Sequence, residues 1–513
     1  MVGRPPAVRV LAALAVATFY AGLAAVSGNH VFDQGTVRAD GGPLTGDGFP
    51  LEAGDDPGSA GQSPSSGDPA SGPASEAGEV GELGAPTSST PTGGGPGSRG
   101  GPGTTAPGPG DEPGGGDATT ITIGVHDDNP GAAFSQFGVQ GGPSGDQGVW
   151  IREIVKWINA NGGMGGREVR LVHHVTESLN GSFDQQAERA CTLFTEDNDA
   201  AVVVGGARVP TLNLVECLAR HDTPLVWSYG FMADASTFAR HADYLYMPAM
   251  VQAERLAVWI DAVAEAKFFD DSVIGLVRYD TPIHDRLAND VVRPRLAAYG
   301  HEVRSENEFA FQEAQAASSA ADMSAQASNA VLRFRTNGVD RVILQPTSAV
   351  APLLFFAAAE SQGFRPRYTY TSYDNPAFQD ANAGDRTNQL RGSMVFGWIP
   401  AGDVDAENFP PMNAAAERCV EITSGATPPG NGAIRRYCDG LMFLKFLFDG
   451  GAEPTTAGIR RAVDALGSSY PSAWTLRAVL GPGRHDGAAV GRIVEFDDGC
   501  RCYKYTGPER PIP

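Results

Sequence analysis

The stretch from Gly148 to His174 reads GVWIREIVKWINANGGMGGREVRLVHH and contains a helix pattern, a glycine turn and a strand pattern in succession. Its apolar residues from Trp150 to Ile158 recur at three- and four-residue steps, which is the stripe of an amphipathic helix. Asn161-Gly162-Gly163 ends this helix, because glycine accepts the left-handed conformation that a helix C-terminus commonly needs. The segment from Arg167 to Val172 then alternates polar with apolar residues, as a strand does.

Another short strand pattern, Ile121-Thr122-Ile123-Gly124-Val125, precedes this stretch. Strand, helix, glycine turn and strand together make one βαβ unit. A crossover of this kind pairs its two strands in parallel. The sequence therefore predicts a parallel sheet that begins near residue 121.

Alternation of strands and helices continues to the end of the chain. The expected strands and extended segments are 201–205, 224–227, 244–247, 272–277, 301–304, 340–344, 368–371 and 491–496. The expected helices are 183–194, 211–220, 252–266, 284–299, 323–335, 349–361, 412–423, 434–448 and 455–466. Two separate runs of such units, each of about 120 residues, predict two lobes rather than one long sheet.

The run from Trp157 to Gly163, followed by Gly166-Arg167 and a strand, resembles the first helix and turn of type I periplasmic solute-binding proteins. The leucine/isoleucine/valine-binding branch is the most similar, and the resemblance covers about residues 119–505. It implies an α/β fold of two lobes, each a parallel sheet flanked by helices, with a ligand cleft between them. It also implies three crossings between lobes, so that 119–247 and 375–470 form lobe 1 and 248–374 and 471–513 form lobe 2.

Residues 1–27 are predicted to be a signal peptide or an N-terminal membrane anchor. Arg4 and Arg9 precede an apolar run from Val10 to Val26, whose 17 residues are short for a membrane span and long for a signal-peptide core. Ala25-Val26-Ser27 offers a small-x-small cleavage site, so a cleaved signal peptide and an uncleaved membrane anchor are both open. No cysteine lies close to the end of the run, since the first in the chain is Cys191, and this excludes a lipoprotein anchor. In either case the rest of the chain is expected outside the cytoplasm, secreted or anchored.

Residues 28–118 are predicted to form a disordered, acidic linker rich in glycine, proline and serine. They contain almost no aliphatic clusters, so they cannot bury enough apolar surface to offset the entropy of ordering. Thirteen acidic and two basic residues lie between Ser27 and Ala118. Their net charge of -11 is half of the formal net charge of -22. The folded part is therefore only moderately acidic, and a nucleic-acid partner, which requires a basic face, is not expected.

Six cysteines in an exported chain suggest disulfides, although six allow fifteen pairings. Cys191 and Cys217 lie on successive predicted helices and could be neighbours, as could Cys419 and Cys438. Cys500 and Cys502 would remain, and their ring would be small. A structural role is favoured over redox chemistry. No metal site is predicted, since the last pair has no histidine or further cysteine nearby.

Ligands of open α/β sheets bind outside the carboxyl ends of the strands. That rule selects five loops, and the rule and the resemblance together give the candidate ligand-binding residues. These are Asp127, Phe137, Arg208, Val209, Tyr229, Phe231, Tyr279, Thr347 and, after the next strand, Asp374.

The pocket implied by the resemblance is only partly preserved. The hydroxyl and amide positions that hold a ligand carboxylate in the family correspond to Val209, Tyr229 and Phe231. The tyrosines that line the family cleft fall on Phe137, Ile283 and Thr347. The acid that pairs with the ligand's ammonium corresponds to Asp374. A simple branched-chain amino acid is therefore not the expected ligand.

Each candidate also has a plain structural reading. Arg208 could grip a carboxylate or phosphate in a bidentate manner or lie on the surface. Trp227 could line an apolar ligand site together with Tyr229 and Phe231, or it could pack in the core. Asp374 could pair with a ligand or cap a loop. Asp127 and Asp128 could attract a cation or simply be solvated.

No enzyme motif is recognisable, since the sequence has no G-x-S-x-G elbow, phosphate loop or H-E-x-x-H. His173-His174 lies on a strand, where successive rings face opposite sides, so it is a poor metal clamp. The Gly205-Gly206 turn lacks the third glycine and the acid of a dinucleotide site, and no cofactor is expected. The favoured function is a solute-binding protein that delivers a small ligand to an ABC permease, and the alternative is an extracytoplasmic sensor or adaptor for a membrane partner.

Overall fold

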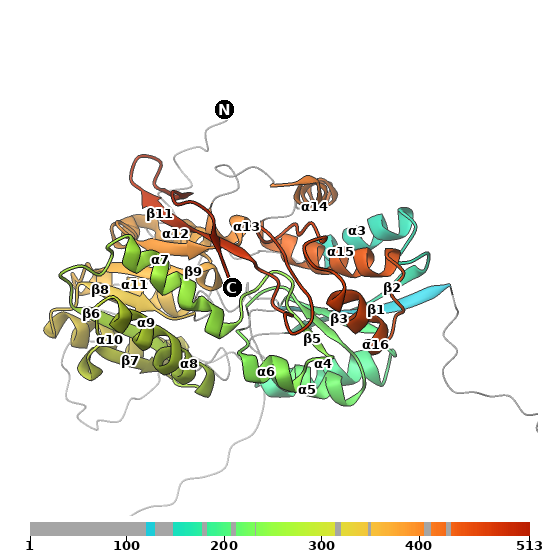
Figure 1. Cartoon of the computed structure of the whole chain (residues 1–513), viewed down its shortest axis with the longest axis horizontal. Helices are drawn as coiled ribbons and strands as arrows, with labels where there is room; N and C mark the ends of the chain where they lie inside the picture. The colour runs from blue at the N-terminus through green and yellow to red at the C-terminus, as the bar shows by residue number, and fades with distance from the viewer. Residues whose placement is uncertain are drawn as a thin grey trace, which may run out of the picture. The chain divides into compact units, whose positions relative to one another are not determined.

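The computed structural model describes residues 119–128, 147–176, 182–206, 212–230, 232–312, 320–346, 350–404, 412–426 and 432–513 (Figure 1). All of them belong to one unit of the chain. The first sheet has the strand order β2-β1-β3-β4-β5, and every pair in it is parallel. Its strands are β1 Thr120–Asp128, β2 Glu168–Thr176, β3 Val202–Gly205, β4 Leu225–Trp227 and β5 Leu245–Tyr246. The predicted parallel sheet is confirmed.

The predicted βαβ unit forms β1, α3 (Gln147–Ala160) and β2. The Asn159 side chain joins the helix end to the second strand, because its amide donates to the Val169 carbonyl at 3.0 Å and its oxygen accepts from the Val169 N-H at 2.8 Å. Gly163 has a φ of 69°, and a Cβ there would collide with the Arg167 backbone. Only glycine fits this turn.

Helices cover both faces of the first sheet. Successive residues of β3 face different helices. Val202 and Val204 belong to the core formed with α3 and α15 (Arg435–Asp449), while Val203 belongs to the core formed with α4 (Phe183–Thr195) and α5 (Leu212–Arg220). Figure 1 shows α3 and α15 on one side of these strands and α4 and α5 on the other. The helices of this half are α4 Phe183–Thr195, α5 Leu212–Arg220, α6 Ala235–Arg240, α14 Ala414–Ser424, α15 Arg435–Asp449 and α16 Thr456–Asp464.

The second sheet has the order β12-β11-β10-β9-β8-β6-β7, with β13 paired to β11. Its pairs are parallel from β7 to β10 and antiparallel from β10 onward. Its strands are β6 Ile274–Tyr279, β7 Glu308–Phe311, β8 Arg341–Leu344, β9 Arg367–Thr371, β10 Met394–Gly397, β11 Val490–Asp497, β12 Cys502–Tyr505 and β13 Arg510–Pro511. Two helix-flanked sheets confirm the predicted fold class.

The helical elements that remain include several short turns next to longer helices. They are η1 Ala253–Leu256, α7 Ala257–Glu265, α8 Pro282–Arg286, the π-helical η2 Leu287–Val292, α9 Arg293–Ala298, η3 Ser305–Asn307, α10 Ala320–Thr336, α11 Val350–Ser361, η5 Ser372–Asp374, α12 Pro376–Ala383, η6 Gly384–Gln389, α13 Pro400–Asp403 and η7 Gly432–Ile434. Of these, η7 is the exception, because it directly precedes α15 and belongs to the first half.

Two expectations for the second half are wrong. The strand expected at 301–304 is β7 at Glu308–Phe311, where Phe309 and Phe311 pack edge to face at 5.2 Å and give the strand its apolar contacts. The return to the first lobe, expected at residue 375, comes later, because β10 pairs with β9 and β11 in the second sheet. The segment from 375 to at least Gly397 therefore belongs to the second half.

The chain passes between the sheets in segments that hydrogen-bond to one another. Met247 donates its N-H to the His485 carbonyl at 2.7 Å, and Gly487 donates to the Met247 carbonyl at 2.8 Å. The segment after β10 joins them, since the Leu476 N-H donates to the Trp398 carbonyl at 2.9 Å. These three segments form the connection between the halves.

All six cysteines are paired, as Cys191–Cys217, Cys419–Cys438 and Cys500–Cys502. The first joins α4 to α5 and the second joins α14 to α15. The third closes a ring of only three residues at the turn between β11 and β12.

Replacing Cys419 and Cys438 together with serine is expected to lower the free energy of unfolding by about 3 kcal/mol, because the bridge restricts a loop with a sequence separation of 19 in the unfolded chain. Urea denaturation under non-oxidising and oxidising conditions measures this loss. The matched control removes Cys500 and Cys502, whose separation of 2 restricts far less chain. The prediction is wrong if removing Cys500 and Cys502 lowers the free energy of unfolding as much as removing Cys419 and Cys438.

Within the described residues no helix is both long and apolar enough to cross a membrane. The signal or anchor expected at 1–27 and the linker expected at 28–118 lie outside the described residues.

Candidate functional site

The strand order of the first sheet reverses between β1 and β3. The chain places β2 on one side of β1 and the later strands on the other side. Sheets with this order bind ligands outside the carboxyl ends of the strands at that point. Asp127 and Asp128 end β1, Gly205 ends β3, and Tyr229 follows β4. We take this edge as the candidate site.

Arg436, in the first turn of α15, lies against this edge with a side-chain exposure of 1%. Its Nη2 donates to Asp128 Oδ1 at 3.0 Å and to Gln147 Oε1 at 3.3 Å. Burial alone would lower the pKa of Arg436, but the nearby Tyr437 hydroxyl and Asp128 carboxylate raise it, so the guanidinium stays charged. A buried cation is tolerated here because a buried carboxylate faces it.

Asp127 is also buried and does not point into solvent. Its Oδ1 accepts from the Tyr437 hydroxyl at 2.5 Å, and its Oδ2 lies 3.4 Å from His173 Nε2. Burial raises the pKa of Asp127, while the nearby His173 and the hydrogen bond from Tyr437 act in the opposite direction. The reading of Asp127 and Asp128 as simply solvated acids is therefore wrong, since both are about 1% exposed.

Three histidines lie beside this edge, and the strand geometry places His173 on the opposite face from His126 and His174. His126 stacks on His174 with ring centroids 5.7 Å apart and bonds Thr176 Oγ1 through Nε2 at 2.8 Å. Burial lowers the pKa of His126 to about 3, and His174 and His173 add to the effect, so the ring is neutral at pH 7. His173 faces the opposite side, toward Asp127, as expected for adjacent strand residues.

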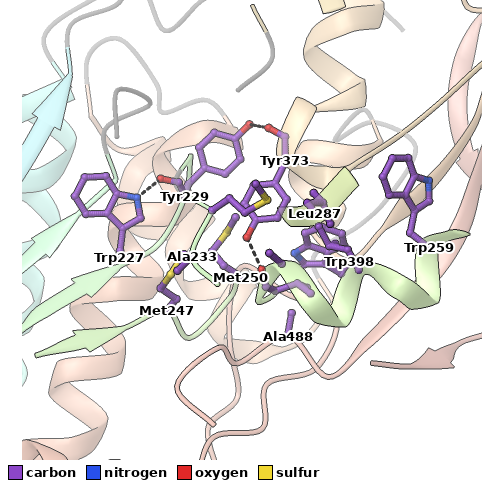
Figure 2. Packing of buried hydrophobic residues seen from close by; sticks show 14 of the residues in the cluster. Trp227, Tyr229, Ala233, Met247, Met250, Trp259, Leu287, Tyr373, Trp398 and Ala488 are labelled. Carbon is purple, nitrogen blue, oxygen red and sulfur yellow. Dashed lines mark hydrogen bonds between the residues drawn. The ribbon is translucent and has the colours of Figure 1, made fainter. Parts of the chain in front are cut away.

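Tyr229 joins the first half to the second. Its hydroxyl donates to the Tyr373 carbonyl at 3.2 Å, and the Tyr373 hydroxyl donates to the Val251 carbonyl at 2.5 Å. Figure 2 shows these side chains together, with Trp227 Nε1 donating to the Tyr229 carbonyl. Trp227 is 1% exposed and packs in the core, which is its plain structural reading.

The carboxyl end of the second sheet holds the other described candidates. The Tyr279 ring meets His284 edge to face at 5.4 Å, and His284 bonds the Pro346 carbonyl through Nε2 at 2.7 Å. Asp374 follows β9 and is fully buried, and its carbonyl accepts from Gln379 Nε2 at 2.9 Å. Neither side chain lies on the exposed surface.

A buried carboxylate, Asp403, lies near the ends of β9 and β10. Its Oδ2 accepts from the Tyr505 hydroxyl at 2.6 Å and from the Ile399 N-H at 2.8 Å. Burial raises the pKa of Asp403 to about 7, although the hydrogen bonds from Tyr505 and Ser372 favour the charged form. Its charge therefore changes near neutral pH.

Five candidates fall outside the described residues, and their places in the site stay predictions. They are Phe137, Arg208, Val209, Phe231 and Thr347. Conversely, sequence reasoning missed Arg436 and Tyr437. One signal was present, because Arg436 shares the buried face of α15 with Gly440, Phe443 and Leu447, at steps of four, three and four residues.

A family described as periplasmic binding protein matches residues 120–500. The chain therefore belongs to the periplasmic binding protein family. No curated protein matches in the corresponding comparison.

Solved structures of low sequence identity share the fold. A solute-binding protein of an R. palustris ABC transporter, in complex with 4-hydroxybenzoate, is 14% identical with a TM-score of 0.57 and covers 77% of this chain and 98% of its own. A branched-chain amino acid transporter substrate-binding protein from Streptococcus pneumoniae, in complex with isoleucine, is 12% identical with a TM-score of 0.54, covering 76% and 100%. A substrate-binding protein from Desulfitobacterium hafniense in complex with Leu is 14% identical with a TM-score of 0.51, covering 75% and 100%.

Proposed function

We propose that this chain is an exported solute-binding protein that captures a small ligand, amino-acid-like or a related polar metabolite, between two closing lobes for an ABC importer. The observation that carries the proposal is the hydrogen bond from the Tyr229 hydroxyl to the Tyr373 carbonyl. It brings the segment after β4 of the first sheet to the segment after β9 of the second. Both carboxyl ends, where α/β sheets bind ligands, therefore come within reach of one molecule.

Family membership and the ligands of the similar structures support a binding role over catalysis. Those structures hold leucine, isoleucine and 4-hydroxybenzoate, all small carboxylic acids. The three hydrogen-bonded connecting segments supply a hinge about which two lobes could close, and closure favoured only with ligand present gives affinity.

Isothermal titration of the full-length protein against amino acids, their amides, short peptides and aromatic acids tests the proposal. We expect one class to bind with a dissociation constant in the micromolar range or below, with compaction visible in solution scattering. Failure of every small metabolite to bind would contradict the proposal. Capture of a membrane kinase or surface enzyme instead of a permease would favour the sensor alternative.

Export and tethering are part of the same proposal. Family membership supports a binding domain outside the cytoplasm, and the proposed linker at 28–118 would hold it away from the membrane if residues 1–27 stay attached. The intact mass of the mature protein decides between cleavage and retention.

A further inference from the structure

Arg436 contacts the carboxyl ends of three neighbouring strands at once. Its Nη2 bonds Asp128 at the end of β1, and its guanidinium carbon lies 5.7 Å from the centre of the Tyr229 ring after β4. A Cβ added to Gly206, after β3, would lie 3.2 Å from Arg436 Nε and 2.7 Å from the Tyr437 ring. The absence of that Cβ lets a cation lie where such sheets receive ligands.

The guanidinium has hydrogen-bond donors that the described protein does not use. All its hydrogen bonds to described residues run through Nη2. Nε is buried and donates to none of the described residues. A buried, charged N-H without an acceptor is costly, and an anionic oxygen is the acceptor that satisfies it best.

The same edge provides no matching acid for a ligand cation among the described residues. Asp128 is occupied by Arg436, and Asp127 accepts from the Tyr437 hydroxyl and the Asp128 N-H. Two aromatic rings flank the guanidinium, those of Tyr229 and Tyr437, the latter at 4.8 Å. The surroundings therefore suit an anion attached to an apolar or aromatic body.

We propose that Arg436 determines specificity by binding the carboxylate of the ligand, and so restricts the ligand to small carboxylic acids. This inference rests on the proposed function. It differs from the expectation that loops after β3 and β4 hold the carboxylate, and it adds a residue from the C-terminal part of the chain.

Titration of the full-length protein with matched acids and amides tests this. The pairs are leucine with leucinamide and 4-hydroxybenzoate with 4-hydroxybenzamide, which also separates amino acids from aromatic acids. We expect at least one acid to bind at least about 100-fold more tightly than its amide. Arg436→Lys should weaken binding of that acid at least about 10-fold and reduce the acid-to-amide ratio, because a lysine lacks the planar set of donors.

Arg436→Gln leaves Asp128 without its buried partner and can fail to fold, so it is combined with Asp128→Asn. This double variant should bind acid and amide with a ratio near one. Arg435→Gln, one position earlier on α15, is the matched control and should keep the wild-type ratio. Unchanged acid preference in the Arg436 variants, or equal binding of acid and amide by wild type, overturns this inference alone. Absence of binding in every arm overturns the proposed function with it.

Discussion

Replacing Gly487 with alanine lowers the free energy of unfolding by at least about 3 kcal/mol, because the added methyl group has no space. Gly487 lies in the last connecting segment, and a Cβ there would be 2.5 Å from the carbonyl carbon of Pro248 in the first one. The obstacle is backbone, so a rotamer change cannot relieve it. The two segments must separate, which also strains the hydrogen bonds between Met247 and the 485–488 region. Denaturant unfolding followed by tryptophan fluorescence measures the loss.

Gly481→Ala is the matched control, six residues earlier in the same segment. The nearest atom to a Cβ there is the Asp464 carbonyl oxygen at 3.8 Å, an ordinary contact. We expect this variant to stay within about 1 kcal/mol of wild type. If Gly487→Ala is equally harmless, the close approach of the connecting segments does not exist in solution.

Replacing Asp403 with asparagine raises stability relative to wild type, and the gain increases as pH rises from about 4 to about 7. The folded pKa of Asp403 is raised by burial from 3.8 to about 7. The folded state therefore holds a proton that the unfolded state releases within this window, so wild type loses stability as pH rises. Above pH 7 both states are ionised and the difference is constant. The full loss corresponds to about 4 kcal/mol, and asparagine, which does not titrate, avoids it.

Thermal unfolding of both proteins from pH 4 to pH 9 checks this sign. Asp498, whose side chain is 61% exposed, gives the matched control, and Asp498→Asn should change stability by less than about 0.5 kcal/mol at every pH. A stability difference for Asp403→Asn that shrinks with rising pH would show that the carboxylate form is favoured by its neighbours.

The periodicity of the sequence predicts most of the fold. The helix from Gln147 to Ala160 and its glycine turn are visible because local patterns and a required positive φ determine them. Strand β10 is not visible, since four apolar residues between turns carry no alternation and its neighbours β9 and β11 lie far apart in sequence. The expected strand at 301–304 fails because the apolar alternation begins only at Phe309.

The candidate site is less accessible to sequence reasoning. Loops after β1, β4 and β6 can be placed by rule, and so Asp127, Tyr229 and Tyr279 can be named. Burial and partners cannot, because they depend on tertiary contacts. The ion pair of Arg436 with Asp128 joins residues 308 positions apart, and nothing local marks either as a partner of the other.

The same separation affects the synthesis of the protein. Val202 and Val204 of β3 share their core with Leu441 and Leu444 of α15, so this apolar face is bare in a nascent chain that ends before the last helices. Early folding of the N-terminal strands would leave an intermediate with one face of the sheet exposed and prone to aggregation. Contacts of such long range also form slowly. A chain whose last helices are available before β3 folds would not populate that intermediate.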